Sequence, residues 1–214
     1  MKQLLTLKSI SSLIALAGLI SLPVFSGCEG GGDSHDFGDN DPNLVACIGD
    51  SITQGYRCIG DPYPARLSVM SGKATLNYGV GGTDSSYGVS IISSVLSRKP
   101  GYVCILFGSN DAIHGEVPAN TKENLRAIIA ACKANNSVPI IGTPPKMIGG
   151  HMLFDGSASR MAEAIRELAS EEHVALVDLY KAFGDGIEYL NPDDGLHLSD
   201  AGGDLVAQKF NSKL

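Results

Sequence analysis

Five short apolar runs alternate with helical stripes along most of this chain, and this alternation restricts the fold more than any other feature. Short, uninterrupted apolar runs are typical of strands that are covered on both faces. The pattern therefore predicts an α/β fold of three layers, with a five-stranded parallel sheet and a single core. The runs lie at residues 44–48, 74–78, 102–107, 138–142 and 174–177, and the clearest stripes at Ile91, Ile92, Val95 and Leu96, at Leu125, Ile128, Ile129 and Cys132, and at Met161, Ile165, Leu168 and Ala169.

Polar segments marked by glycine follow the first three predicted strands. They are Gly49-Asp50-Ser51, Gly79-Val80-Gly81-Gly82 and Gly108-Ser109-Asn110-Asp111. A fourth segment, Asp194-Gly195-Leu196-His197, precedes a shorter helical stripe near the C-terminus. Ligands of open α/β sheets bind beyond the carboxyl ends of the strands. We therefore expect the four segments to meet in one crevice.

The four segments together contain the groups that acyl transfer requires. A serine hydroxyl is a weak nucleophile and needs a base within hydrogen-bond reach. His197 precedes a helical stripe and has a carboxylate three residues earlier, at Asp194, that can orient the imidazole ring. Taken singly, each such residue is more often a helix cap, a turn former or a surface residue. Their joint occurrence favours a hydrolytic site.

The four segments resemble, in order and separation, the four sequence blocks of the SGNH (GDSL-like) hydrolases. The resemblance extends from about residue 44 to residue 210, and residues 108–141 are similar to the lysophospholipase and arylesterase branch. Ile52 stands in place of the family's leucine, and Gly81 stands where a serine is common. The resemblance implies a serine esterase with a flavodoxin-like fold and the strand order 2-1-3-4-5.

The resemblance and the chemistry together give each residue an expected role. Ser51 is the expected nucleophile, His197 the general base, and Asp194 the acid that orients the base. The oxyanion of the tetrahedral intermediate is expected to bind the backbone N–H groups of Ser51 and Gly82 and the side-chain amide of Asn110.

Composition and missing motifs argue against several other classes of function. The chain has 16 Lys and Arg against 23 Asp and Glu, a net charge of −7, which disfavours a nucleic acid partner. It contains no G-x-G-x-x-G and no G-x-x-x-x-G-K-[ST] motif, so we expect no nucleotide cofactor. His114 and Glu116 lack a third ligand nearby, and His151 and His173 stand alone, so we expect pocket lining or solvated loops and no metal site.

Two local predictions concern the surroundings of the crevice. Asn120, with Glu123 three residues later, is expected to cap a helix over residues 124–133. Residues 149–157 (GGHMLFDGS) are expected to shape the pocket, and their Met152, Leu153 and Phe154 suit either an acyl chain or the core.

Two cysteines are expected on neighbouring strands. Cys47 lies in the first predicted strand and Cys104 in the third. A disulfide between them is conceivable in an exported protein. Two buried free thiols are the preferred interpretation, because adjacent parallel strands seldom bring cysteines into bridging geometry.

The N-terminal residues have the pattern of a targeting segment. Residues 1–27 combine two lysines with an apolar stretch that ends at Ser26-Gly27, which predicts a signal peptide. Phe25-Ser26-Gly27-Cys28 resembles the end of a bacterial lipoprotein signal, so Cys28 is the expected lipid site and the cell envelope the expected location. The alternatives are a protein secreted without a lipid and a retained membrane anchor, since the uncharged run of residues 9–27 is long enough to span a bilayer. Residues 28–43 are expected to be a flexible acidic tether, and residues 44–214 the hydrolase domain.

The sequence thus predicts an exported, monomeric serine ester hydrolase that acts on small or short-chain acyl esters through an acyl-enzyme. Its substrate is a lysophospholipid or aryl ester or a carbohydrate acetyl ester. No cofactor is expected, and the membrane is expected to be a partner only through a lipid on Cys28. The alternative is a surface module on the same fold that binds glycan without turnover.

Overall fold

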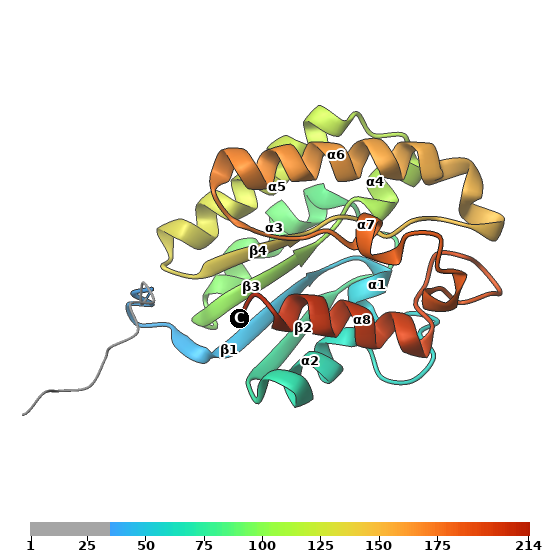
Figure 1. Cartoon of the computed structure of the whole chain (residues 1–214). Coiled ribbons are helices and arrows are strands. Elements are labelled where there is room, and N and C mark those ends of the chain that lie inside the picture. The colour runs from blue at the N-terminus through green and yellow to red at the C-terminus, as the bar shows by residue number, and fades with distance from the viewer. Residues whose placement is uncertain (1–34) are drawn as a thin grey trace, which may run out of the picture. The chain divides into compact units, whose positions relative to one another are not determined.

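The computed structural model describes residues 35–214, and the predicted signal peptide and Cys28 lie outside these residues. Five parallel strands form one sheet in the order β2-β1-β3-β4-β5 (Figure 1). The predicted fold class and strand order are therefore confirmed. The strands are β1 (Asp41–Gly49), β2 (Ala74–Gly79), β3 (Pro100–Leu106), β4 (Val138–Gly142) and β5 (Ala175–Val177).

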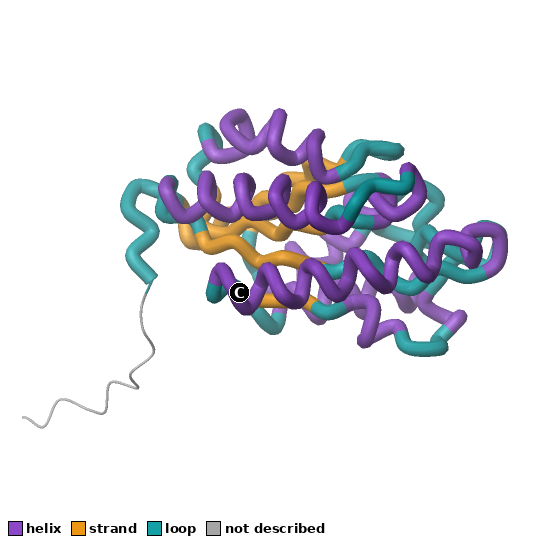
Figure 2. Tube along the Cα trace, turned by 90° about the horizontal axis from the view of Figure 1, so that it is seen from above, coloured by secondary structure: helices purple, strands orange, loops and turns teal. Residues whose placement is uncertain are grey.

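Helices cover both faces of the sheet. In Figure 1 the strands run between two helical layers, one with α2 and α8 and the other with α3, α5 and α6. Figure 2 shows the strands and their covering helices from above. The helices are α1 (Ser51–Gln54), α2 (Tyr63–Ser71), α3 (Ser85–Leu96), α4 (Ser109–His114), α5 (Pro118–Ala134), α6 (Asp155–Glu172), α7 (Leu179–Phe183) and α8 (Asp200–Asn211), and the 3-10 helices are η1 (Gly149–Phe154) and η2 (Ile187–Tyr189).

Alternation along the central strand explains why the core has two halves. Successive side chains of a strand point to opposite faces of its sheet. Val45 and Cys47 of β1 accordingly pack in the half of the core with α2 and α8, whereas Ala46 and Ile48 pack in the half with α3, α5 and α6. All four side chains are fully buried, as expected for a strand between two helical layers.

Strand register brings three of the predicted segments to one level. Gly49 at the end of β1 pairs with Gly79 of β2 and with Leu106 of β3. The loops that begin after these residues therefore leave the sheet side by side at its carboxyl edge. This arrangement brings the segments that contain Ser51, Gly82 and Asn110 together.

Two predicted boundaries are corrected. The strand β1 begins at Asp41, inside the segment that was expected to be a tether up to residue 43. Residues just before it pack as well: the Phe37 ring lies 5.2 Å from the Tyr102 ring, and Asn40 is buried. The helix α5 begins at Pro118, so Asn120 lies in its first turn and does not cap it; proline at the first turn sets the start instead.

The described cysteines are free thiols. Cys47 and Cys104 occupy paired positions of β1 and β3 and are both buried, which confirms the interpretation as two buried free thiols. Within residues 35–214, no helix combines the length and the apolar character that crossing a membrane requires.

Candidate active site

Ser51 stands at the point where β1 turns into α1. Asp50 caps this short helix, because its Oδ1 accepts a hydrogen bond of 2.8 Å from the Ile52 N–H. Ser51 is the first residue of the helix, so its own N–H has no intrahelical acceptor. Ser51 is 7% exposed and lines a pocket. The turn thus presents both the hydroxyl and the backbone N–H of one residue.

Three predicted residues form a continuous hydrogen-bonded chain. His197 Nε2 lies 2.9 Å from Ser51 Oγ, and His197 Nδ1 lies 2.8 Å from Asp194 Oδ2. A carboxylate only accepts hydrogen bonds, so Nδ1 carries the proton of the neutral ring. The lone pair of Nε2 then faces the serine hydroxyl. This is the tautomer in which an imidazole can remove a proton from serine.

Asp194 is held by several donors at once. Its Oδ1 accepts hydrogen bonds from the backbone N–H groups of Leu196 and His197, at 2.9 and 3.0 Å. Burial by itself raises the pKa of Asp194, but these bonds and the His197 ring outweigh it and hold the pKa below its ordinary range. The carboxyl is therefore ionised at neutral pH, as an acid that orients an imidazole must be.

Gly195 shapes the loop that contains Asp194 and His197. It has a φ of +70°, in the region where side chains are strained, and a Cβ there would lie 2.2 Å from the Ile148 carbonyl oxygen. That close approach allows the Ile148 N–H to donate to the Gly195 carbonyl at 2.9 Å. The glycine thus holds the loop that contains Asp194 and His197 against the segment after β4.

Gly82 and Asn110 lie on the pocket that Ser51 lines. Gly82 has a φ of +77°, and a Cβ built on it would meet nothing within 4 Å, so its backbone faces open space. The Asn110 Nδ2 donates one hydrogen bond of 2.9 Å to the Thr83 carbonyl. An amide nitrogen carries two hydrogens, so the second remains for a ligand. The structure brings four predicted site residues, Ser51, Gly82, Asn110 and His197, to one pocket, and the fifth, Asp194, contacts the His197 ring from outside the lining.

Asp111 supports the asparagine next to it, a role that sequence reasoning did not assign. Asp111 is 1% exposed, and its Oδ1 accepts hydrogen bonds from the Ser85 hydroxyl at 2.5 Å and the Thr121 hydroxyl at 2.8 Å. These bonds join the starts of α3, α4 and α5. Asn110 is therefore presented from a junction of three helices.

The pocket has a volume of about 620 Å³ and is mainly apolar apart from Ser51, Asn110 and His197. Tyr56, Val80, Ile113 and Leu196 contribute its apolar lining, and Gln54 and His151 add two further polar side chains. The Tyr56 ring packs edge-on against the His197 ring, with centroids 5.0 Å apart. The apolar lining suits the hydrocarbon part of a small ligand.

The lining differs in part from the sequence-based expectation for residues 149–157. Met152 and Leu153 are 64% and 90% exposed and do not line the pocket, so the acyl-chain interpretation of these two residues is wrong. Phe154 packs in a small core cluster. His151 of the same segment does line the pocket. The 3-10 helix η1 turns its histidine inward and its apolar tip outward.

Arg57 is another residue that sequence reasoning missed. Its Nη1 lies 3.4 Å from Asp194 Oδ2, and its carbonyl oxygen accepts a hydrogen bond of 2.9 Å from Asn191 Nδ2. It adopts a φ of +52°, which is uncommon for a residue with a side chain. No sequence motif indicates the contact between Arg57 and Asp194, because 137 residues separate them.

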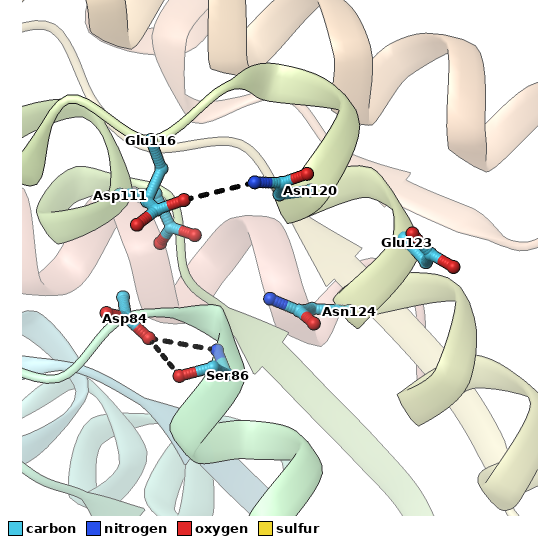
Figure 3. A pocket seen from close by; sticks show the side chains of 7 residues that line it. All are labelled: Asp84, Ser86, Asp111, Glu116, Asn120, Glu123 and Asn124. Carbon is cyan, nitrogen blue, oxygen red and sulfur yellow. Dashed lines mark hydrogen bonds between the residues drawn. The ribbon is translucent and has the colours of Figure 1, made fainter.

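A second, acidic pocket of about 260 Å³ lies between the starts of α3 and α5 and shares no lining residue with the first (Figure 3). It includes Asp84 and Glu116, while His114 lies 3.6 Å from Asp84. Figure 3 shows Ser86 bonded to Asp84 and Asn120 bonded to Glu116. Within residues 35–214, no group of three or more His, Cys, Asp or Glu side chains is arranged to hold a metal ion.

A protein-family model and a solved crystal structure both match most of this chain. A model of the GDSL-like Lipase/Acylhydrolase family matches residues 47–205, which contain all four sequence segments of the site. The crystal structure of a lipase/acylhydrolase from Enterococcus faecalis is 26% identical in sequence, with a TM-score of 0.68. That similarity covers 79% of this chain and 93% of the other.

Curated relatives agree with the family match. Thioesterase 1/protease 1/lysophospholipase L1 of Escherichia coli K12 is 31% identical over 103 residues, which are 46% of this chain and 50% of that protein. The chain thus spans about half the length of that relative. Esterase TesA of Pseudomonas aeruginosa is 27% identical over 165 residues, which are 72% of this chain and 75% of that protein.

Proposed function

The chain belongs to the GDSL-like lipase/acylhydrolase family, and we propose that it is a serine hydrolase that cleaves small or short-chain acyl esters through an acyl-enzyme. The observation that carries the proposal is the hydrogen-bonded chain Ser51–His197–Asp194, with contacts of 2.9 and 2.8 Å, on the wall of an apolar pocket. A nucleophile joined to a base that is itself oriented by an acid is the arrangement that acyl transfer uses.

The first half of the reaction forms the acyl-enzyme. Ser51 Oγ attacks the ester carbonyl carbon while its proton moves to His197 Nε2, giving a tetrahedral intermediate and an imidazolium. Asp194 stabilises the imidazolium and keeps the ring in place. The C–O bond to the alcohol then breaks, and His197 gives its proton to the departing oxygen. The alcohol leaves, and the acyl group stays on Ser51.

The oxyanion of the intermediate needs donors that are already in position. The backbone N–H groups of Ser51 and Gly82 donate to no backbone carbonyl within residues 35–214, and Asn110 has a second amide hydrogen free. Donors fixed before the reaction stabilise developing charge without reorganising. We assign these three groups to the oxyanion.

The second half releases the acid. A water molecule gives a proton to His197 Nε2 and attacks the acyl carbon, so a second tetrahedral intermediate forms on the same oxyanion donors. The bond to Ser51 Oγ breaks, and His197 returns the proton to that oxygen. The products are a carboxylic acid and the starting enzyme.

The substrate class follows from the pocket's volume and lining. About 620 Å³ with Tyr56, Val80, Ile113 and Leu196 around the nucleophile suits a short acyl chain with a small alcohol. Aryl acetates and carbohydrate acetyl esters present such an acyl group, whereas a lysophospholipid carries a longer acyl chain and fits this pocket less well. We further propose that the chain acts as a monomer in the cell envelope, anchored through a lipid on Cys28.

The competing interpretation is a module that binds glycan without turnover, and a fluorophosphonate probe separates the two. The probe phosphonylates a serine only where a base activates it. We expect one label per wild-type chain and none on Ser51→Ala. Labelling that is absent from a folded wild type would favour the binding module, and labelling that persists in Ser51→Ala would assign the nucleophile elsewhere.

A further inference from the structure

We propose that His151 is a specificity-determining residue that accepts a hydrogen bond from a hydroxyl group on the alcohol part of the ester. The inference rests on the proposed function and makes it narrower: the preferred substrates are partial acyl esters of polyols, such as glycerol or a sugar. Esters of plain alcohols, which carry no such hydroxyl, are predicted to be poorer substrates.

The tautomer of His151 follows from its one hydrogen bond. Nδ1 lies 2.8 Å from the backbone carbonyl oxygen of Asp194. A carbonyl cannot donate, so Nδ1 carries the hydrogen, and Nε2 of the neutral ring is left as an acceptor. Within residues 35–214, nothing lies in hydrogen-bond contact with Nε2. A nitrogen that can only accept therefore remains unpaired on a ring that lines the reaction pocket.

His151 is tied to the side of the pocket from which the alcohol leaves. His197 must lie beside the departing oxygen, because it gives that oxygen a proton. Both imidazoles bind the same residue: the ring of His197 contacts the Asp194 carboxylate, and the ring of His151 contacts the Asp194 carbonyl. The acceptor of His151 is thus fixed relative to the base and not to the oxyanion donors.

A second base is not the role of this histidine. The Ser51 hydroxyl already contacts His197 Nε2 at 2.9 Å, and the partner of His151 Nδ1 is a neutral carbonyl and not a carboxylate. An unprotonated nitrogen in a mainly apolar pocket is complementary to an O–H donor. An ester that offers only hydrocarbon there leaves the nitrogen without a partner, which weakens binding of that ester.

The test compares esters that differ only in whether their alcohol part carries hydroxyl groups or methyl groups in the same places. The first pair is 2-hydroxyethyl acetate and propyl acetate, and the second is glycerol 1-acetate and 2-methylbutyl acetate; each pair has the same number of heavy atoms. The quantity measured is the ratio of kcat/KM for the hydroxylated ester to that for its hydrocarbon partner. Differences in intrinsic reactivity cancel when this ratio is compared between variants.

Two substitutions separate recognition from support of the loop. His151→Asn places an amide N–H near the position of Nδ1, so it keeps the bond to Asp194 and removes the acceptor. His151→Gln places an amide group near the position of Nε2. We expect the ratio to fall about 3- to 10-fold in His151→Asn, the value of one neutral hydrogen bond, and to recover in part in His151→Gln. Leu153→Ala, an exposed neighbour, should keep the wild-type ratio.

Two outcomes would overturn the inference. One is a wild-type ratio in an active His151→Asn variant. The other is an equal loss on all four esters, which would make His151 a support of the Asp194 loop only. Failure of the proposed function itself looks different: the wild type would then hydrolyse neither these esters nor p-nitrophenyl acetate and would take no fluorophosphonate label.

Discussion

At the scale of single residues, Asp194 connects more of the site than any other group. Its carboxylate binds the His197 ring and two backbone N–H groups, and its carbonyl oxygen binds the His151 ring. Arg57 Nη1 lies 3.4 Å from Asp194 Oδ2, the oxygen that also contacts His197. The residue before it, Asp193, is exposed and has only its backbone N–H bonded, to Asn191. Two adjacent carboxylates thus have very different surroundings.

Replacing each carboxylate in turn tests which one orients the base. Asp194→Asn keeps size but admits the wrong tautomer of His197, so kcat is expected to fall by about 10²- to 10⁴-fold. Asp193→Asn should stay within about twofold of wild type, since surface changes seldom matter. Steady-state hydrolysis of p-nitrophenyl acetate measures both. The reverse order of defects would show that the D-x-x-H spacing selects the wrong residue.

Asp50 predicts a dependence of stability on pH. Complete burial, with a smaller contribution from the nearby Asp111 charge, raises the pKa of Asp50 from 3.8 to about 7, and its Oδ2 has no hydrogen-bond partner among the described residues. Between these two values the folded protein holds the proton more tightly than the unfolded chain. Unfolding therefore releases protons, and the free energy of unfolding falls as pH rises through this range.

Asp50→Asn removes this titration while an amide oxygen can still cap α1. From pH 5 to pH 8 the free energy of unfolding of the wild type is expected to fall by about 2.6 kcal/mol more than that of the variant, at about 1.4 kcal/mol per pH unit up to the folded-state pKa of about 7. Urea unfolding of both proteins at the two pH values gives this difference. The contributions of all other titrating groups to the free energy of unfolding are the same in both proteins and cancel. Equal losses in the two proteins would mean that Asp50 is ionised in the folded state throughout.

Short-range signals explain which site residues the sequence could predict. Ser51, Gly82, Asn110, Asp194 and His197 each lie in a segment that a strand end or a three-residue spacing marks. Arg57 and His151 carry no such mark. Their contacts with Asp194 depend on how loops from distant parts of the chain pack, and single-sequence patterns do not contain that information.

At the scale of elements, the loop from Asn191 to Leu198 packs closely against the backbone of Ile148 at one glycine, Gly195. Gly195 combines a φ of +70° with a Cβ position 2.2 Å from the Ile148 carbonyl. Gly72, at the end of α2, has nearly the same φ, +69°, but nothing within 4 Å of its Cβ position. Comparing substitutions at Gly72 and Gly195 therefore separates the cost of a left-handed backbone from the cost of a steric clash with a neighbouring residue.

Alanine at these two glycines should give unequal losses of stability. Gly72→Ala is expected to lower the free energy of unfolding by about 1 kcal/mol, from the left-handed backbone alone. Gly195→Ala should lower it by at least about 3 kcal/mol, because the loop must also move away from Ile148. It should reduce kcat as well, since Asp194 and His197 flank it. Similar stabilities of the two variants in urea would contradict the proposed close contact.

Strands were easier to predict than helix starts for a physical reason. Every predicted strand agrees with an observed one to within three residues at either end, because an apolar run needs burial on both faces. The start of α5 depends on competition between Pro118, which favours the first helical position, and Asn120, which favours the capping position before a helix. The 3-10 helix η1 has no periodic pattern from which its inward and outward faces could be read.

At the scale of the whole molecule, the fold places the four segments at one edge of the sheet. The proposed location in the cell envelope rests instead on the N-terminal residues. The proposed lipid site, Cys28, lies outside the described part of the chain. We expect radiolabelled palmitate to enter the wild type in a bacterial host and not Cys28→Ser. Cys58→Ser, a described thiol that is partly exposed, is the matched control and should label like wild type. Release of unlabelled wild type into the medium would favour simple secretion.

The parallel sheet also explains why the fold could be predicted as a whole. Alternating strands and helices leave few topologies, and the resemblance implied the order that the structure has. The first strand extends further toward the N-terminus than predicted, because Asp41, Pro42 and Asn43 are exposed polar or ring residues without an apolar pattern. At Asp41 the strand pairs with β3 through backbone hydrogen bonds, without burial of the side chain.

The central claim is that Ser51 and His197 act as one catalytic unit, and a double-mutant cycle tests it most directly. The measured quantity is kcat for p-nitrophenyl acetate in wild type, Ser51→Ala, His197→Ala and the double variant. The account predicts that each single change lowers kcat by about 10³-fold or more and that the double variant is no slower than the worse single one, because removing either partner disables both. Near wild-type turnover in either single variant, or losses that multiply in the double variant, would contradict it.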